Sequence, residues 1–268
     1  MFRNISIIGI GNLSQTLLYC IKNKSLKFNI NLFDLDKKKK VFASKKEWSF
    51  STKINKSLSE SDLVILAVKP YQYKDVCAKI NTYANNKAVI VSLMAGITIK
   101  DLKEAFPDKL SIARVMTNIN AKYSNAISSI YIDKRFRKDK IASLKKFFSL
   151  FGSINILKSE SQINKITALV GSGPAYFIYF AESMIKTFQS FGFTKYESEI
   201  LVCELFYGTA KTCITDKRSL DEIKKSVVSK GGTTEAALKK FDKLKTKKII
   251  MESIREAFVR AVDLGKGK

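Results

Sequence analysis

The first residues whose types and spacing could do chemistry form a glycine turn near the start of the chain. Residues 9–14 read GIGNLS and lie between an apolar run and an amphipathic stretch. In such a GxGxxS pattern the first glycine allows a tight turn, and the second lets backbone N–H groups approach a pyrophosphate at the positive end of a helix. The third position needs a small residue, which serine supplies. We predict a dinucleotide-binding turn made by Gly9, Gly11, Asn12, Leu13 and Ser14.

An acidic residue stands where such a turn needs one, at the end of the second apolar run. The carboxylate of Asp34 could accept hydrogen bonds from the ribose hydroxyls of NADH, and it would repel the additional phosphate of NADPH. The lysine run 37–40 follows and could hold that phosphate, although it could equally form a solvated helix face. The pattern therefore leans towards NADH, and the predicted cofactor is NADH or NADPH.

The elements that must position these residues alternate between short β-branched runs and helical stretches up to about residue 160. Several runs are apolar at consecutive positions, as expected for strands that are covered on both faces. Amphipathic stretches at 12–22 and 138–151 separate them. The pattern predicts an α/β fold with a doubly wound sheet of the Rossmann type. The predicted strands are 6–8, 30–33, 63–68, 88–93, 112–116 and 127–132.

From residue 161 onward the sequence predicts helices alone. Proline suits the first position of a helix over 174–192, capping boxes begin helices near 194 and 219, and a last helix spans about 247–264. The segment 174–180 is apolar on nearly every side, so it needs cover from its own domain or from a partner subunit. We predict a dinucleotide-binding domain at 1–160 and an all-helical domain for substrate binding and dimerisation at 161–268.

Composition excludes several classes of function. The 268 residues contain no histidine and four cysteines without paired spacing, which argues against a metal site, a histidine-based triad and a disulfide scaffold. No apolar run is long enough to cross a membrane. The net charge of +24 would suit a polyanion, but the lysines are spread along the chain without a nucleic-acid motif. We expect a cytoplasmic protein whose main partner is a small molecule.

Four further segments carry a resemblance to a known family. They read AVKP at 67–70, SLMAGIT at 92–98, GSGPAY at 171–176 and SKGGTT at 229–234. In this order and spacing they resemble the motifs of pyrroline-5-carboxylate reductases, from residue 5 to about 265. The resemblance implies hydride transfer from NAD(P)H to the C=N bond of 1-pyrroline-5-carboxylate, giving L-proline in the last step of proline biosynthesis. It also implies a homodimer or a higher homo-oligomer.

The resemblance also assigns roles to residues. The loop at 231–232 frees backbone N–H groups before a helix that starts near Thr233 or Thr234, which could bind a carboxylate or could simply be a capped helix start. In the family Thr234 would be the proton donor, and so the catalytic residue. The implied substrate-binding residues are Ser229, Gly231, Gly232, Thr233, Thr234, Met116 and Asn118. The implied cofactor-binding residues, besides the turn and Asp34, are Asn55, Ala67, Val68, Lys69, Pro70, Ala95 and Gly96.

The chain departs from the family pattern at several positions. Residues 114–120 read RVMTNIN where the family has RxMPNTP, Lys230 replaces a proline, and Lys186 stands where an aspartate is usual. Loss of the second proline removes a rigid turn near the substrate pocket. Two alternatives therefore stay open: a reductase of a related imine or of a β-hydroxy acid, and a degenerate homologue that binds polyanions.

Overall fold

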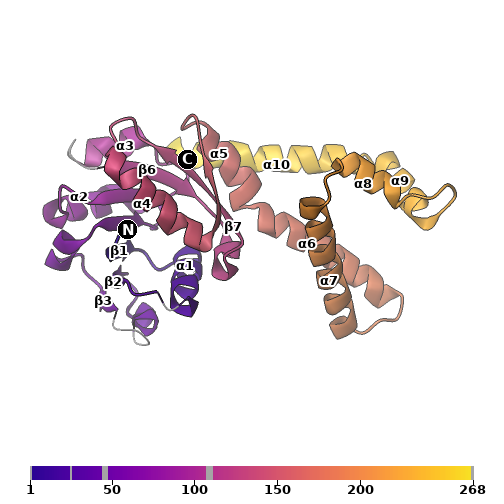
Figure 1. Cartoon of the computed structure of the whole chain (residues 1–268), viewed down its shortest axis with the longest axis horizontal. Coiled ribbons are helices and arrows are strands. Elements are labelled where there is room, and N and C mark those ends of the chain that lie inside the picture. Colours follow the sequence, from indigo (N-terminus) through magenta and orange to yellow (C-terminus); the bar gives the residue numbers. More distant parts are fainter. Residues whose placement is uncertain (1, 25, 44–47, 107–110, 267–268) are drawn as a thin grey trace. The chain divides into compact units, whose positions relative to one another are not determined.

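A computed structural model describes residues 2–24, 26–43, 48–106 and 111–266 (Figure 1). Eight strands form one sheet in the order β3-β2-β1-β4-β5-β6-β7-β8. All neighbours pair in parallel except β6 and β7, which are antiparallel. The strands are β1 (Asn4–Ile8), β2 (Asn29–Phe33), β3 (Ser49–Ser51), β4 (Leu63–Leu66), β5 (Val89–Ser92), β6 (Ser111–Met116), β7 (Ala126–Ile132) and β8 (Gly152–Ile156).

The strand order fixes where a ligand can enter. The chain runs outward from β1 through β2 to β3 and then returns to the other side of β1 with β4. The crevice beyond the carboxyl ends of β1 and β4 is therefore the switch point of the sheet, where open α/β sheets bind their ligands. The predicted doubly wound sheet is confirmed.

Apolar layers cover both faces of the sheet. Helices α1 (Asn12–Asn23) and α4 (Lys138–Phe148) pack on one face, and α2 (Tyr73–Tyr83) and α3 (Ile99–Ala105) pack on the other. Every residue of β4 and β5 is buried, because these central strands have helices on both sides. Burial raises the pKa of the Cys77 thiol in α2 to about 12, so that this thiol is a packing group and not a nucleophile.

The described residues divide into two compact units. The first contains the sheet, the residues up to Pro174 and the residues from Ala257 on. It includes α5 (Gln162–Ile166) and a π-helical turn at Thr167–Gly171. The second is Ala175–Glu256, formed by most of α6 (Gly173–Ser190), by α7 (Lys195–Thr215), α8 (Leu220–Ser226) and α9 (Thr233–Lys243), and by the first part of α10 (Thr246–Asp263). The boundary at residue 160 that the sequence predicts between a dinucleotide-binding domain and an all-helical domain stays a prediction.

Most predicted elements are present, with differences at the edges of the sheet. The two capping boxes exist as expected, with Thr194 and Ser219 accepting hydrogen bonds from the amides of Glu197 and Glu222. Strands β3 and β8 were not predicted. Both are edge strands with polar or exposed residues, SFS and GSINI, so they lack the continuous apolar run of a central strand.

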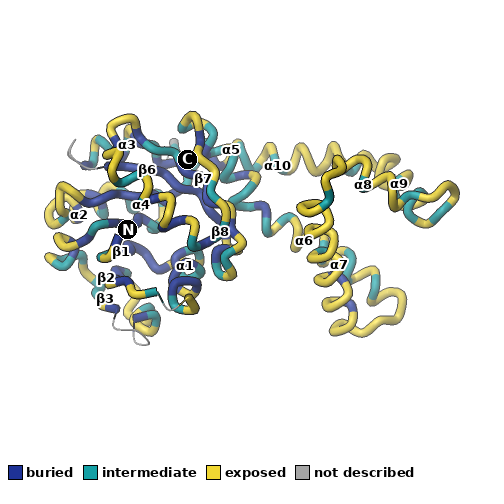
Figure 2. The backbone as a smooth tube through the Cα atoms, in the orientation of Figure 1, coloured by how far each residue is buried: buried dark blue, intermediate teal, exposed yellow. Residues whose placement is uncertain are grey.

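The second unit has little interior of its own. Within it only Ser198 and Val202, both on α7, are buried, whereas the remaining described residues are partly or fully exposed (Figure 2). Large apolar side chains of α6 are open to solvent, with Phe177 67% and Tyr179 75% exposed. An apolar surface of this kind marks an interaction site. Among the described residues, no helix has the combination of length and apolar content that a membrane span requires.

Candidate active site

The glycine turn joins β1 to α1 at the switch point of the sheet. Gly9 has a φ of +95°, and a β-carbon on it would lie 2.7 Å from the carbonyl oxygen of Ala67. The amide of Gly9 donates to the carbonyl of Phe33 at 2.8 Å, and the amide of Ala67 donates to the carbonyl of Ile8 at 2.8 Å. Only glycine combines this conformation with so close an approach of two backbones. The turn is thus seated directly on the end of β4.

The second glycine of the turn, Gly11, has open space around it, in contrast to Gly9. Gly11 is the N-cap of α1, and a β-carbon on it would meet nothing within 4 Å. Ser14, one turn into the helix, is buried, and its hydroxyl donates to the carbonyl of Gly9 at 2.7 Å. The serine that breaks the usual glycine pattern therefore ties the helix to the turn. Space for a phosphate remains open at Gly11, at the positive end of α1.

The carboxylate of Asp34 braces the turn from the end of β2. One of its oxygens accepts the amide of Ile10 at 2.6 Å, and the other accepts the amide of Asp36 at 2.9 Å. A carboxylate has about four lone-pair sites, so both oxygens can still accept a ribose hydroxyl. Asp36 caps the short helix η1 (Lys37–Phe42) that carries the lysine run, three of whose lysines are exposed.

The loop that follows β5 is held by a close backbone approach. Gly96 has a φ of +79°, and a β-carbon there would collide with the backbone of Leu264 and Gly265 at the end of the chain's last helix. Ala95 beside it is partly exposed, whereas Gly96 is buried. In the segment that follows the neighbouring strand β4, Lys69 is exposed and Pro70 begins a short helical turn. The loops after β4 and β5, both predicted to face the nicotinamide, thus lie at the same edge of the sheet.

Three predicted site residues have structural partners of their own. Asn55 caps the turn η2 (Lys56–Glu60) through its side-chain oxygen, which accepts the amide of Ser57 at 3.0 Å. Asn118 is buried after β6, and its amide group donates to the carbonyl of Val170 at 3.0 Å. Met116 is buried against Leu157 and Ile163. Their predicted roles towards ribose and substrate remain predictions.

The loop 229–232, which precedes α9, bends at its two glycines as the sequence predicts. Gly231 has a φ of +74°, and Gly232 is the N-cap of α9. Ser229 and Thr233 are exposed, and Thr234 is partly exposed. No acceptor is recorded among the described residues for the amides of Thr233 and Thr234, as expected at a helix start. The glycine amides themselves are not free as expected, because the amide of Gly232 donates to the carbonyl of Ser229 at 3.0 Å and that of Gly231 donates to Glu235.

The structure adds a carboxylate that sequence reasoning missed. The amide of Gly231 donates to Oε2 of Glu235 at 2.7 Å, and Lys239 lies 3.0 Å from the other oxygen of that carboxylate. The hydrogen bond from the Gly231 amide, with the nearby lysine, lowers the pKa of the Glu235 carboxyl. A glutamate at the third helical position is a sequence signal for a capping contact and could have revealed it.

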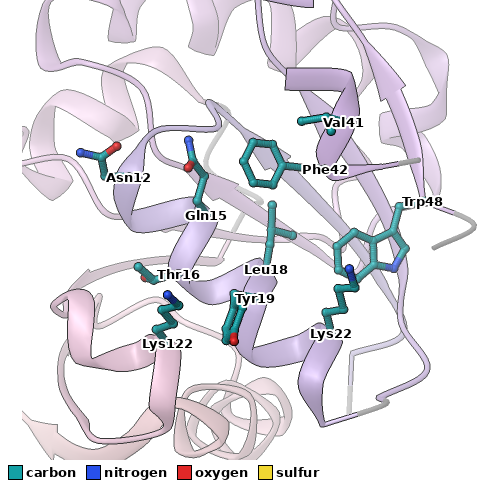
Figure 3. Close-up of a pocket in the computed structure, with 10 residues that line it drawn as sticks. All are labelled: Asn12, Gln15, Thr16, Leu18, Tyr19, Lys22, Val41, Phe42, Trp48 and Lys122. Atoms are coloured by element: carbon teal, nitrogen blue, oxygen red, sulfur yellow. The ribbon is translucent and has the colours of Figure 1, made fainter. Parts of the chain in front are cut away.

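A hollow of about 440 Å³ lies on the outer side of α1 (Figure 3). The ammonium group of Lys122 stands 4.6 Å from the ring centre of Tyr19 at its edge. Of the predicted cofactor residues only Asn12 lines this hollow. Its lining consists of Asn12, Gln15, Thr16, Leu18, Tyr19, Lys22, Val41, Phe42, Trp48 and Lys122.

The described residues include no group of three or more cysteine, aspartate, glutamate or histidine side chains that could hold a metal ion. What the first unit does bring together is the glycine turn, Asp34 and the ends of β4 and β5 at one edge of the sheet. This constellation has the parts of a dinucleotide site: a tight turn, open amides at a helix start and an acidic residue at the end of the second strand.

Comparison with known proteins agrees with this constellation. The family model described as pyrroline-5-carboxylate reductase dimerisation matches residues 160–264, and the one described as NADP oxidoreductase, coenzyme F420-dependent, matches residues 4–96. Pyrroline-5-carboxylate reductase from Staphylococcus haemolyticus is 28% identical over 264 residues, which covers 97% of each chain. The enzyme of the same name from Staphylococcus aureus strain COL is 29% identical over 266 residues and 96% of each chain.

Solved structures have the same fold. A pyrroline-5-carboxylate reductase from Coxiella burnetii is 26% identical, with a TM-score of 0.86 over 98% of each chain. The pyrroline carboxylate reductase of Plasmodium falciparum, solved with NADP bound, has a TM-score of 0.90 over 98% of each chain at 22% identity. With matches along nearly its whole length, and the turn, acid and strand ends in place, the chain is similar to the pyrroline-5-carboxylate reductases, a family of NAD(P)-dependent oxidoreductases.

Proposed function

We propose that this protein transfers a hydride from NADPH or NADH to the C=N carbon of 1-pyrroline-5-carboxylate, giving L-proline as the last step of proline biosynthesis in the cytoplasm. The observation that carries the proposal is the seating of Gly9 on the end of β4, with Gly11 left open at the start of α1. This arrangement leaves room for a pyrophosphate and directs the rest of a dinucleotide along the ends of β4 and β5.

The cofactor supplies the hydride when it is bound, and the protein's part is to hold and orient it. Gly11, Asn12, Leu13 and Ser14 would hold the pyrophosphate, and Asp34 with Asn55 would contact the ribose near the adenine. The backbones of 67–70 and 95–96 would face the nicotinamide. Gly96 supports this role because its contact with Gly265 fixes the loop in one conformation.

The substrate side of the proposal rests on the loop before α9. At the bend formed by Gly231 and Gly232, the hydroxyl of Ser229 and the open amide of Thr233 would bind the ring carboxylate, and Thr234 would deliver the proton to the ring nitrogen. Two features support this: the amides of the first turn of α9, which have no recorded acceptor among the described residues, and the positive end of its dipole. The chain contains no histidine, and the reaction needs none, because a protonated imine is already activated for hydride attack.

We also propose that the protein is a homodimer or a larger homo-oligomer. The exposed apolar side chains of α6, such as Phe177 and Tyr179, would be covered by the same unit of a second copy. The family model that matches residues 160–264 describes a dimerisation domain, which supports the proposed homo-oligomer.

The direct test is a steady-state assay of NADH and NADPH oxidation with 1-pyrroline-5-carboxylate. Gly11→Trp should abolish turnover without unfolding the chain, because the position opens to empty space and an indole there would block the pyrophosphate. Asn23→Trp, an exposed position on the same helix, is the matched control and should remain active. A folded protein that binds cofactor yet reduces no cyclic imine would refute the proposal.

The second candidate function is the reduction of a related imine or of a β-hydroxy acid. It is supported by Thr117 and Lys230, which stand where the family motifs have proline. Thr117, where the family motif has its first proline, is buried and accepts a hydrogen bond from Ser128 at 3.1 Å, so a polar contact stands where the family has a proline ring. Parallel assays with six-membered cyclic imines and with β-hydroxy acids distinguish the two candidates by their ratios of kcat/KM.

A further inference from the structure

A buried arginine on β6 has an incomplete set of partners. The side chain of Arg114 is 3% exposed, and its Nη1 donates to Oε1 of Glu160 at 2.9 Å. Its Nε and Nη2 have no partner among the described residues. Burial lowers the pKa of the guanidinium, and the hydrogen bond to Glu160 opposes that shift. A guanidinium stays charged in proteins, so Glu160 is the group that compensates a charge taken out of water.

The same carboxylate oxygen has a second donor. Oε1 of Glu160 accepts the amide of Ile99 at 2.6 Å, the first residue of α3. Helix α3 already has a complete capping box, in which Thr98 and Asp101 satisfy each other. The contact from Glu160 is therefore additional to the normal cap, and it comes from 61 residues further along the chain.

The two donors belong to the two sides of the proposed site. Ile99 directly follows the loop 95–98, whose residues 95–96 we propose to face the nicotinamide. Arg114 precedes Met116 and Asn118, which the family resemblance predicts to bind the substrate. Helices α3 and α5 both pack against β6 (Figure 1). Glu160 lies in the segment between β8 and α5. One oxygen atom thus joins three segments that are far apart in sequence.

We propose that Glu160 is a positioning residue for hydride transfer: by binding Ile99 and Arg114 at once, it fixes the cofactor-facing loop relative to the end of β6. The inference rests on the proposed reductase function. Glu160 acts through the backbone of one segment and the guanidinium of the other. A misplacement of about 1 Å in a reacting pair can cost a factor of roughly 100 in rate, so a carboxylate outside the site can control kcat.

The principal variant is Glu160→Gln. A glutamine can still accept one hydrogen bond but removes the ion-paired carboxylate from the buried guanidinium, which keeps only the weaker charge interaction with Asp101, so the loop and the strand should separate. The expected result is a fall in kcat of about tenfold or more, with the KM values for NAD(P)H and the imine changed less than about threefold. The deuterium isotope effect with cofactor labelled at the transferred hydrogen should rise, because hydride transfer becomes slower than the other steps.

Two further variants separate positioning from stability. In the double variant Arg114→Met with Glu160→Gln both charges are gone, so the thermal midpoint should recover towards that of the native chain while kcat stays low. Asp133→Asn breaks a neighbouring ion pair, Lys103 to Asp133 at 2.7 Å, which does not join the two segments. This control should lose stability and keep kcat and the isotope effect.

A second readout does not depend on turnover. Bound NADH should keep its dissociation constant within about twofold in Glu160→Gln, because the pyrophosphate contacts lie elsewhere, while its nicotinamide fluorescence changes. If the native chain reduces the imine but Glu160→Gln has an unchanged kcat and isotope effect, the inference fails and the function stands. If the native chain reduces no imine, the function fails, and unchanged nicotinamide fluorescence in the variant then overturns the inference independently.

Discussion

The backbone amide of Gly231 donates a hydrogen bond of 2.7 Å to the Glu235 carboxylate, which belongs to the helix that follows. The contact holds the glycine at a φ of +74° and so shapes the loop that we propose to bind the substrate carboxylate. We therefore propose that the Glu235 carboxylate shapes this loop for the carboxylate of the substrate. Within the described part of the chain, the amides of Thr233 and Thr234 have no hydrogen-bond acceptor.

Replacing Glu235 by alanine should raise the KM for the imine by about tenfold with a smaller effect on kcat, because the loop loses a charge-assisted hydrogen bond that orders it. Steady-state kinetics at saturating cofactor measure this. Glu252→Ala, which removes an exposed surface pair with Lys248, is the control and should leave the KM unchanged. An unchanged KM in Glu235→Ala would show that the loop does not need this brace.

The same contact predicts a pH dependence. The Gly231 amide lowers the pKa of the Glu235 carboxyl, so the folded value lies below the value in an unfolded chain. A group shifted in this direction stabilises the loop above the ordinary glutamate pKa, and the contribution is lost as the pH falls through the lowered pKa. Protection of the Gly231 amide against hydrogen exchange should decrease in acid. Glu235→Gln should remove that acid step, and a step of equal size in the variant would contradict the assignment.

The two glycines of the turn should respond differently to alanine. Gly9→Ala forces a side chain into a φ of +95° and against the Ala67 carbonyl, so we expect a loss of at least ~2 kcal/mol in stability. Gly11→Ala meets no atoms within 4 Å, so we expect a change below ~1 kcal/mol. Thermal or denaturant unfolding measures both. Equal losses at the two positions would contradict the seating of the turn on β4.

Asp34 should govern the choice between the two cofactors. In Asp34→Ser the negative charge is gone, so the ratio of kcat/KM for NADPH over NADH should rise by about tenfold or more. Some loss of stability should accompany it, because the amide of Ile10 loses its acceptor at 2.6 Å. Lys38→Gln tests the neighbouring lysine run. This substitution should lower kcat/KM for NADPH only if the run holds the additional phosphate. An unchanged ratio in Asp34→Ser would exclude Asp34 as the selecting group.

The apolar surface of α6 should hold a second copy. Phe177→Asp introduces a charge at a side chain that is 67% exposed in the single chain, so it should shift the protein to a monomer in sizing with light scattering. Gln189→Asp, a charge at an exposed polar position of the same helix, should leave the assembly intact. A stable monomer of the native chain would contradict the proposed homo-oligomer.

Local signals in the sequence determined most of the fold. The central strands were predictable because a parallel strand with helices on both sides must be apolar at consecutive positions. The helix starts at 194 and 219 were predictable because a capping box is complete within four residues. The glycine turn and Asp34 followed from one strand–turn–helix pattern. Strands β3 and β8 were not predicted, because edge strands need no continuous apolar run. Their position depends on the strands β2 and β7 with which they pair.

Only the tertiary structure decided which distant groups meet. That Gly96 needs glycine because Gly265 packs against it, and that Glu160 joins Ile99 to Arg114, cannot be read from any short window of residues. The physical reason is that a hydrogen bond or a close backbone contact acts over a few ångströms in space, whatever the separation along the chain. Sequence patterns report the periodicity of burial, whereas the partners of a buried charge are fixed by how strands and helices pack.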